Sequence, residues 1–235
     1  LHCLIRRQRQ MCIRDRGRCI RRALISLRRQ TIRDFEIIVK DGGSQDDTVQ
    51  VARRYADRVV SGPDRSIADA RNQGAQHARG DILAFVDADT VVPPKTLERL
   101  LQLFDEDRSV VGVSCRKLPI HGDVWDRVLY EFVNLSTLIS SWLGIGGAHG
   151  NCMLIRREIF SRVGGFNPEI QLAEEQELVR KARRFGRFVF LLDTCVLEDP
   201  RRLRRWGRLR LYLTWFLGTL RSFSSSLQRT YEKVR

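Results

Sequence analysis

The sequence predicts an α/β protein in which helices flank a mostly parallel sheet. Short apolar runs typical of buried strands alternate along the chain with longer segments of helical periodicity. The run at residues 82–86 is too short for a helix, is rich in strand formers and stops at an aspartate, as expected of a strand buried on both faces. Polar or glycine-rich turns follow such runs, and ligands of open α/β sheets bind at the carboxyl ends of strands.

The predicted organisation is a basic segment at residues 1–16, one α/β body at 17–199 and a basic tail at 200–235. The net charge of +14 belongs to the ends, which carry +4 and +9, while the body carries +1. A neutral body argues against a nucleic-acid partner. Six scattered cysteines without a C-x-x-C pair or zinc spacing indicate reduced thiols in a cytoplasmic protein. No apolar run is long enough for an ordinary transmembrane helix or has the flanks of a signal peptide.

Residues 1–16 fit neither a helical nor a strand period. The string at 11–16 resembles translated sequencing-adapter sequence, which would be excluded from fold reasoning. We therefore expect this segment to be non-native or disordered and poorly packed, with a natural basic arm as the alternative.

From Gly17 onward the predicted elements alternate regularly. A helix with apolar residues on one face comes first, and the helix at 66–78 is rich in small residues that allow close packing on the sheet. Helices are expected at 20–30, 66–78, 93–104, 125–143 and 156–163, with one that carries residues 51–55 and one that opens at 173–178. Strands are expected at 35–39, 59–60, 82–86, 110–113, 152–155 and 188–192.

Two turns after predicted strands carry the chemistry. Asp87 and Asp89 follow the central strand, and two carboxylates at this spacing can hold a hard divalent cation, which in turn can carry the phosphates of a nucleotide. The turn at 41–44, Asp-Gly-Gly-Ser, lets the backbone bend sharply and approach a ligand closely. Taken alone, this second turn is equally typical of an ordinary strand-to-helix connection.

Other polar residues are open to two interpretations. Spacing alone favours Arg71 as a solvated surface arginine. Acids at Glu174 and Glu175 in a first helical turn are favoured by the helix dipole, or one of them is a general base. The glycine-rich loop at 144–151 can line a pocket, but it matches neither of the common phosphate-binding loops.

The tail carries an apolar helical stripe at residues 203–220 flanked by arginines. Arginines beside a Trp/Phe/Leu face favour a helix that lies in the interface of an anionic membrane, and 209–220 is too short to span it. The alternative is a helix packed on the protein's own body.

Five motifs in this order resemble the inverting family 2 glycosyltransferases of the GT-A fold, over residues 17–207. They are Asp41-Gly42-Gly43-Ser44, Ala70-Arg71-Asn72-Gln73-Gly74, Asp87-Ala88-Asp89, Arg156-Arg157-Glu158-Ile159-Phe160 with Gly164-Gly165-Phe166, and Glu174-Glu175 before Glu177-Leu178. The resemblance implies a metal-dependent, inverting transfer of a sugar from a nucleotide-diphosphate sugar to an acceptor hydroxyl. A role in making cell-envelope polysaccharide is expected with it, and the basic tail alone suggests that the chain works in the cytoplasm at the inner face of the cell membrane.

The resemblance also implies roles for individual residues. Asp41, Gly43, Arg71 and Asp87 would bind the nucleotide sugar, and Asp89 with Asp87 would hold Mn²⁺ or Mg²⁺. Glu175 would be the catalytic base in a place where the family usually has aspartate, with Glu174 as a substitute. His149, Gly150 and Asn151 would line the acceptor pocket, for a glycan or lipid-linked acceptor.

The chain departs from the family pattern at its start. Family members open with a central strand that lines the nucleotide site, and residues 1–16 stand in its place. We therefore expect the first strand to be missing and its neighbours to lack ladder partners, which is costly for buried backbone groups.

Two other function classes fit part of the sequence. Asp87-Ala88-Asp89-Thr90-Val91 also matches the motif of haloacid-dehalogenase-like phosphatases, although three strand-helix units precede it here. The basic ends alone would fit a non-enzymatic membrane- or nucleic-acid-binding module.

Overall fold

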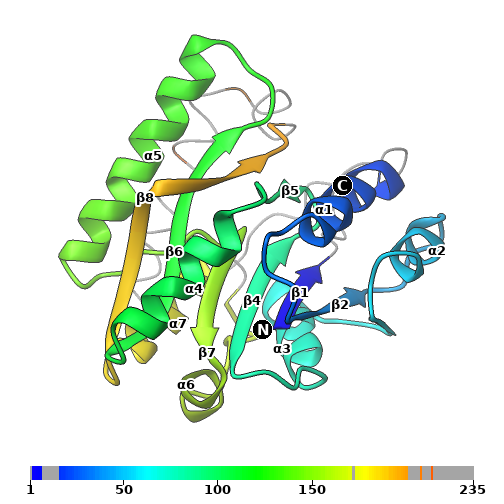
Figure 1. The fold of residues 1–235 in the computed structure, drawn as a ribbon, viewed down its shortest axis with the longest axis horizontal. Coiled ribbons are helices and arrows are strands. Elements are labelled where there is room, and N and C mark those ends of the chain that lie inside the picture. Colours follow the sequence, from blue (N-terminus) through cyan, green and yellow to red (C-terminus); the bar gives the residue numbers. More distant parts are fainter. Residues whose placement is uncertain (1, 7–15, 171–172, 201–206, 208–212, 214–235) are drawn as a thin grey trace.

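The computed structural model describes residues 2–6, 16–170, 173–200, 207 and 213. Helices cover both faces of one eight-stranded sheet (Figure 1), which confirms the predicted α/β class. In chain order the elements are β1 (His2–Arg6), α1 (Arg16–Arg28), β2 (Glu36–Asp41), α2 (Thr48–Arg53), β3 (Arg58–Ser61), α3 (Ile67–Ala75), β4 (Ile82–Asp87), β5 (Thr90–Val91), α4 (Thr96–Glu106), β6 (Val110–Pro119), α5 (Val124–Trp142), β7 (Cys152–Arg156), α6 (Arg157–Arg162), α7 (Glu174–Ala182) and β8 (Arg187–Glu198).

The strand order is β3-β2-β1-β4-β7-β6-β8-β5. The first four strands in this order are mutually parallel, and β6 is parallel to β8. Strand β7 is antiparallel to both β4 and β6, and β5 is antiparallel to β8. The sheet is therefore mixed but mostly parallel, as predicted. The direction of β7 could not be read from its sequence, because a fully buried antiparallel strand is as apolar as a parallel one.

Strand β4 lies at the centre of the molecule, and its side chains alternate between two cores. Ala84 and Val86 pack with residues of α1 and α4 on one face of the sheet. Leu83 and Phe85 pack with residues of α3, α6 and α7 on the other face. Burial on both faces explains the uninterrupted apolar run that marked this strand in the sequence.

Strand β1 corrects the expectation that the first strand is missing. Its residues form parallel ladders with both neighbours, so that Leu4 lies opposite Ile38 of β2 and Phe85 of β4. The backbone groups of β2 and β4 therefore have the partners whose loss was expected. The expectation was wrong because ladder hydrogen bonds come from the backbone of any extended segment, whether or not its side chains show a strand period. Residues 7–15, which hold most of the adapter-like string, lie outside the described part of the chain.

The predicted C-terminal helix lies outside the described residues, except for the isolated positions 207 and 213. Among the helices that the structure describes, none combines the length and the hydrophobicity needed to cross a bilayer.

Candidate active site

The candidate site lies at the carboxyl edge of the sheet, where β2 and β4 end on either side of β1. Arg6 of β1 is in register with Asp87 of β4 and with the residue before Asp41 in β2. Adjacent strands are about 4.8 Å apart, so the two strand ends lie about 10 Å from each other. Asp87 is buried, and Asp89 lies in the turn just beyond it. The fold therefore brings the two predicted aspartate turns to one edge.

Arg71 connects this edge to helix α7. It is buried on α3, against the expectation from spacing of a surface arginine. Its guanidinium donates to Asp87 Oδ1 (3.0 Å), Glu174 Oε1 (2.9 Å) and the Gly150 carbonyl (2.6 Å), and lies 5.2 Å from the Phe166 ring centroid. Burial alone would lower the pKa of Arg71, but the surrounding carboxylates outweigh it and raise the pKa. One fixed positive charge therefore joins three segments of the chain.

Glu174 and Glu175 occupy the first turn of α7, directly after Ala173 in the left-handed region (φ 59°). Glu174 is buried against Arg71, whereas Glu175 keeps part of its surface exposed. Removal from water, and then the neighbouring Glu174, raise the pKa of Glu175 to about 7, and Arg71 opposes this increase. A carboxylate with this pKa can take up a proton near neutral pH, which suits a general base.

Gln176 is a site residue that the sequence analysis missed. Its side-chain amide donates to the Ala148 carbonyl (2.8 Å) and to Glu175 Oε1 (3.3 Å), and its carbonyl accepts from the Gly147 amide (3.0 Å). A Cβ at Gly146 would overlap Gln176 Oε1, so a larger residue there would displace the glutamine side chain from its hydrogen bonds. A glutamine after two acids gave no sequence signal, because its partners lie 28 and 29 residues away.

Two of the three predicted acceptor-pocket residues touch this network. A Cβ at Gly150 would lie 3.1 Å from an Arg71 nitrogen and 3.3 Å from Glu175 Oε2. The Asn151 carbonyl accepts from the Asp87 amide (3.1 Å). The structure therefore places Gly150 between Arg71 and Glu175, next to the end of β4.

His149 is held on the side of the loop that faces α5. Asn134 of α5 accepts from the Lys117 amide and donates to the Lys117 carbonyl, which fixes its side-chain orientation. Its Oδ1 therefore accepts from His149 Nε2 (3.1 Å). Burial, and then Lys117, hold the pKa of His149 well below its usual value, so the ring is neutral. Asn134 was not predicted, because it is one of several polar residues in this helix and nothing in the sequence separates it from the others.

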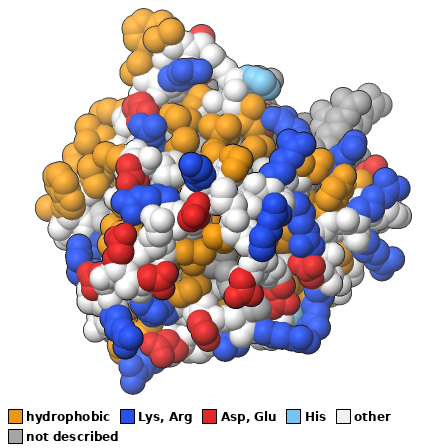
Figure 2. Space-filling view, in the orientation of Figure 1, with side chains coloured by type: hydrophobic (Ala, Val, Ile, Leu, Met, Phe, Trp, Pro, Cys, Tyr) orange, Lys and Arg blue, Asp and Glu red, His pale blue; other side chains and the backbone are white. Residues whose placement is uncertain are grey.

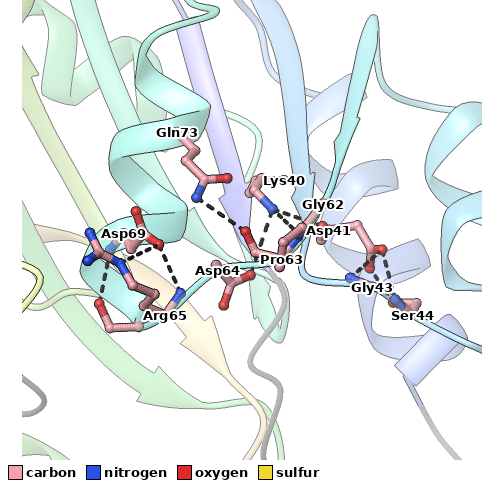
Figure 3. Close-up of polar contacts among 11 residues, drawn as sticks. Lys40, Asp41, Gly43, Ser44, Gly62, Pro63, Asp64, Arg65, Asp69 and Gln73 are labelled. Atoms are coloured by element: carbon pink, nitrogen blue, oxygen red, sulfur yellow. Dashed lines mark hydrogen bonds and ion pairs between the residues drawn. The ribbon is translucent and has the colours of Figure 1, made fainter.

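Asp41 organises its own turn at the end of β2. Its carboxylate accepts from the Gly43 amide (3.0 Å), the Ser44 amide (2.8 Å) and the Ser44 hydroxyl (Figure 3). Gly43 has φ 93°, which an L side chain rarely adopts. The Asp-Gly-Gly-Ser motif is therefore a closed, preformed turn in which Asp41 is fixed.

A buried lysine that the sequence analysis overlooked clamps this turn to the loop after β3. Lys40 Nζ donates to the carbonyls of Asp41 (3.0 Å) and Gly62 (2.6 Å) and lies 3.8 Å from Asp64 Oδ2 (Figure 3). A Cβ at Gly42 would overlap the same Asp64 oxygen. A charged residue inside a buried strand was a usable signal, because lysine is seldom fully buried without partners.

The donor set at the end of β4 fits a hard divalent cation. Asp87 and Asp89 offer carboxylate oxygens, and Asn151 Oδ1 is buried with no hydrogen-bond partner among the described residues. Oxygen ligands suit Mg²⁺ and Mn²⁺. No three His, Cys, Asp or Glu side chains of the described ranges gather into a ready-made metal cage. A cation held here would therefore need further ligands from a bound molecule or from water.

Comparison with solved structures supports the fold. The Pyrobaculum calidifontis mannosyltransferase PcManGT, solved with GDP-Man and Mn²⁺, superimposes with a TM-score of 0.70 at 24% identity, over 94% of this chain and 64% of that one. Staphylococcus aureus TarS 1–349, solved with UDP-GlcNAc, gives a TM-score of 0.61 at 18% identity, over 83% and 56%. The α/β architecture is that of the GT-A glycosyltransferases.

Sequence comparison identifies relatives and the family. A glycosyltransferase of Nostoc sp. PCC 7120 is 33% identical over 221 residues, 90% of this chain and 60% of that protein. The undecaprenyl-phosphate 4-deoxy-4-formamido-L-arabinose transferase of Pseudomonas syringae pv. syringae is 32% identical over 129 residues, 51% and 36%. The chain thus spans less than two thirds of these relatives. Because residues 11–164 match the profile of Glycosyl transferase family 2, the chain belongs to that family.

Proposed function

We propose that this chain transfers a sugar from a nucleotide-diphosphate sugar to an acceptor hydroxyl, with inversion and with the help of a divalent metal ion. The observation that carries the proposal is the Arg71 bridge, which joins Asp87 at the end of β4 to Glu174, beside Glu175. A site of this kind holds the donor on one side and a base of suitable pKa on the other. Family membership argues against the phosphatase and non-enzymatic alternatives.

On the donor side, Asp41 and Gly43 would contact the nucleotide at the end of β2, and Asp87 the ribose. Arg71 is already engaged by Asp87 and Glu174, so its role would be to hold these groups in place and to supply positive charge near the phosphates. Asp89, with Asp87, would hold Mn²⁺ or Mg²⁺. When bound, the ion would offset the charge that builds up on the departing diphosphate.

On the acceptor side, Glu175 would take the proton of the hydroxyl whose oxygen attacks the anomeric carbon. The C–O bond to the diphosphate breaks on the opposite face, which inverts the configuration. A pKa of about 7 leaves roughly half of Glu175 ionised at neutral pH. His149, Gly150 and Asn151 would border the acceptor. His149 would do so as a neutral ring fixed by Asn134.

The acceptor would be a glycan or a lipid-linked group of the cell envelope. The Pseudomonas relative acts, by its name, on undecaprenyl phosphate, which supports a lipid-linked acceptor. We further propose that the chain works in the cytoplasm at the inner face of the membrane, with the arginine-flanked stripe at 201–220 in contact with it.

The test is release or transfer of sugar from a panel of nucleotide sugars with Mn²⁺, comparing wild type with Asp89→Ala. Asp81→Ala is the matched control, because Asp81 precedes β4 at the opposite edge and its side chain is 99% exposed. We expect Asp89→Ala to lose metal-dependent turnover and Asp81→Ala to retain it. Metal-dependent release that survives in Asp89→Ala would refute the metal assignment, and retention of configuration in the product would refute the inverting mechanism.

A further inference from the structure

Helix α5 presents an apolar stripe to the outside of the protein. Trp125 at its start is 68% exposed and Trp142 at its end 77% exposed. The members recur every three or four residues, so they share one face of the helix. Hydrophobic side chains gather in Figure 2 along the edge that α5 occupies in Figure 1. The α5 stripe consists of Val124, Trp125, Val128, Phe132, Leu135, Ile139, Trp142 and the adjoining Leu143.

The α5 stripe is not needed to attach the helix to the protein. The opposite face already does this, with Tyr130, Val133 and Asn134 buried towards β6 and β8. Single exposed apolar residues are ordinary, but a continuous row along 19 residues, about 28 Å, marks an interaction surface. Helix α5 is thus apolar on two faces, one of which the described protein leaves uncovered.

The positive charge that would favour an anionic partner comes from the tail and not from α5. The helix itself carries acids, of which Asp123 and Asp126 form a capping box and Glu131 lies 3.4 Å from Arg116. The basic tail starts next to the first turn of the helix, because the Ile120 amide, four residues before α5, donates to the Glu198 carbonyl at the end of β8 (2.9 Å). Six arginines follow between residues 201 and 210.

We infer that the α5 stripe is a docking surface for an anionic lipid bilayer, with the arginines at 201–210 attracted to the lipid headgroups. An apolar helix face with aromatic side chains at both ends, next to a polybasic segment, is the chemistry that recognises such a surface. A second copy of the chain as the partner would account for the exposed apolar stripe but not for the arginines at 201–210. Leu213, a described residue of the tail, is also 44% exposed, so the body leaves this apolar side chain uncovered as well.

The stripe would hold the candidate active site close to the membrane. The inner face of the same helix carries Asn134, which fixes His149 next to Gly150. One helix diameter, about 10 Å, therefore separates the docking face from the proposed acceptor side of the site. This consequence rests on the proposed function, whereas the docking itself does not.

The experiment is co-sedimentation of the full chain with vesicles of phosphatidylglycerol and phosphatidylcholine, and with vesicles of phosphatidylcholine alone. The test variant is Trp125→Ser/Phe132→Ser/Trp142→Ser. Phe185→Ser/Leu192→Ser is the control, because both residues are exposed apolar side chains that do not belong to α5. Wild type is expected to bind the anionic vesicles, and the triple variant at least about tenfold more weakly, since it removes three large apolar side chains from the interface. The control variant should bind as wild type does.

Equal vesicle binding by wild type and the triple variant would overturn the inference. So would wild type that ignores both vesicles and elutes as a dimer that the triple variant turns into a monomer, because the stripe would then bind a second copy. Circular dichroism checks the fold, and Trp125→Ser alone serves as the test if the triple variant does not fold. Measuring binding also with Asp89→Ala separates this question from the proposed reaction, because that variant should dock normally even without turnover.

Discussion

Replacing Glu174 with glutamine tests the electrostatic origin of the Glu175 pKa. The pKa of Glu175 rises from 4.5 to about 7, which corresponds to about 3 kcal/mol between its two protonation states. Burial is the larger cause and the Glu174 charge the second. Glutamine removes the charge but keeps an oxygen that can accept from Arg71 (2.9 Å in the wild type). Since a like charge nearby raises a carboxylate pKa by about one unit or more, we expect Glu174→Gln to lower the pKa to about 6.

The direct assay is carbon NMR of glutamate side-chain carboxyls during a pH titration, with the Glu175 signal assigned by its loss in Glu175→Gln. In activity, the base works only when ionised, so turnover should rise with pH through about 7 in wild type. In Glu174→Gln the midpoint should move about one unit lower. Glu177→Gln is the matched control, because it removes the same charge from the same turn but from a residue paired with Lys181 (2.6 Å).

Two results would refute this reasoning. One is a Glu175 midpoint that stays near 7 or rises in Glu174→Gln, which would mean that Glu174 does not raise the pKa. The other is an equal decrease in Glu174→Gln and Glu177→Gln, which would reflect general charge rather than the adjacent pair.

Three further variants test the surroundings of the site. Glu175→Gln should stabilise the protein above pH 7 but not at pH 4, as urea unfolding at both pH values would show. A carboxyl with a raised pKa in the folded state binds extra protons between about pH 4.5 and 7, so its contribution to stability decreases as the pH rises through that window. Lys40→Met should cost about 3 kcal/mol in urea unfolding, because it removes the ammonium from buried Asp64, and adding Asp64→Asn should recover part of this loss. Gly147→Ala should cost about 1–3 kcal/mol in thermal unfolding, because φ is 120° and the new Cβ would lie 2.6 Å from the Ser141 Cβ. Equal stability of Glu175→Gln and wild type above pH 7 would contradict the raised pKa, and unchanged stability in Lys40→Met or Gly147→Ala would contradict the corresponding contact.

The sequence by itself determined the class of fold, the position of the central strand and the family. These follow from local features: uninterrupted apolar runs mark buried strands, and the aspartates that end them are visible in the chain. Asp41 and Asp87 could be selected as candidates in this way, and Glu175 from its place in the first turn of a predicted helix. The charge distribution likewise separated a neutral body from basic ends without any structure.

Only the tertiary structure decided how those candidates are connected. Arg71 was indistinguishable from a surface arginine, because its carboxylate partners lie 16 and 103 residues away in the chain. The pKa of Glu175 depends on burial by segments that meet only in the folded state. Strand β1 shows the same limit, since its lack of periodicity and the adapter-like string after it suggested disorder, while the backbones of β2 and β4 supplied its hydrogen-bond partners. Long-range contacts, not local composition, set the protonation, orientation and pairing on which this site depends.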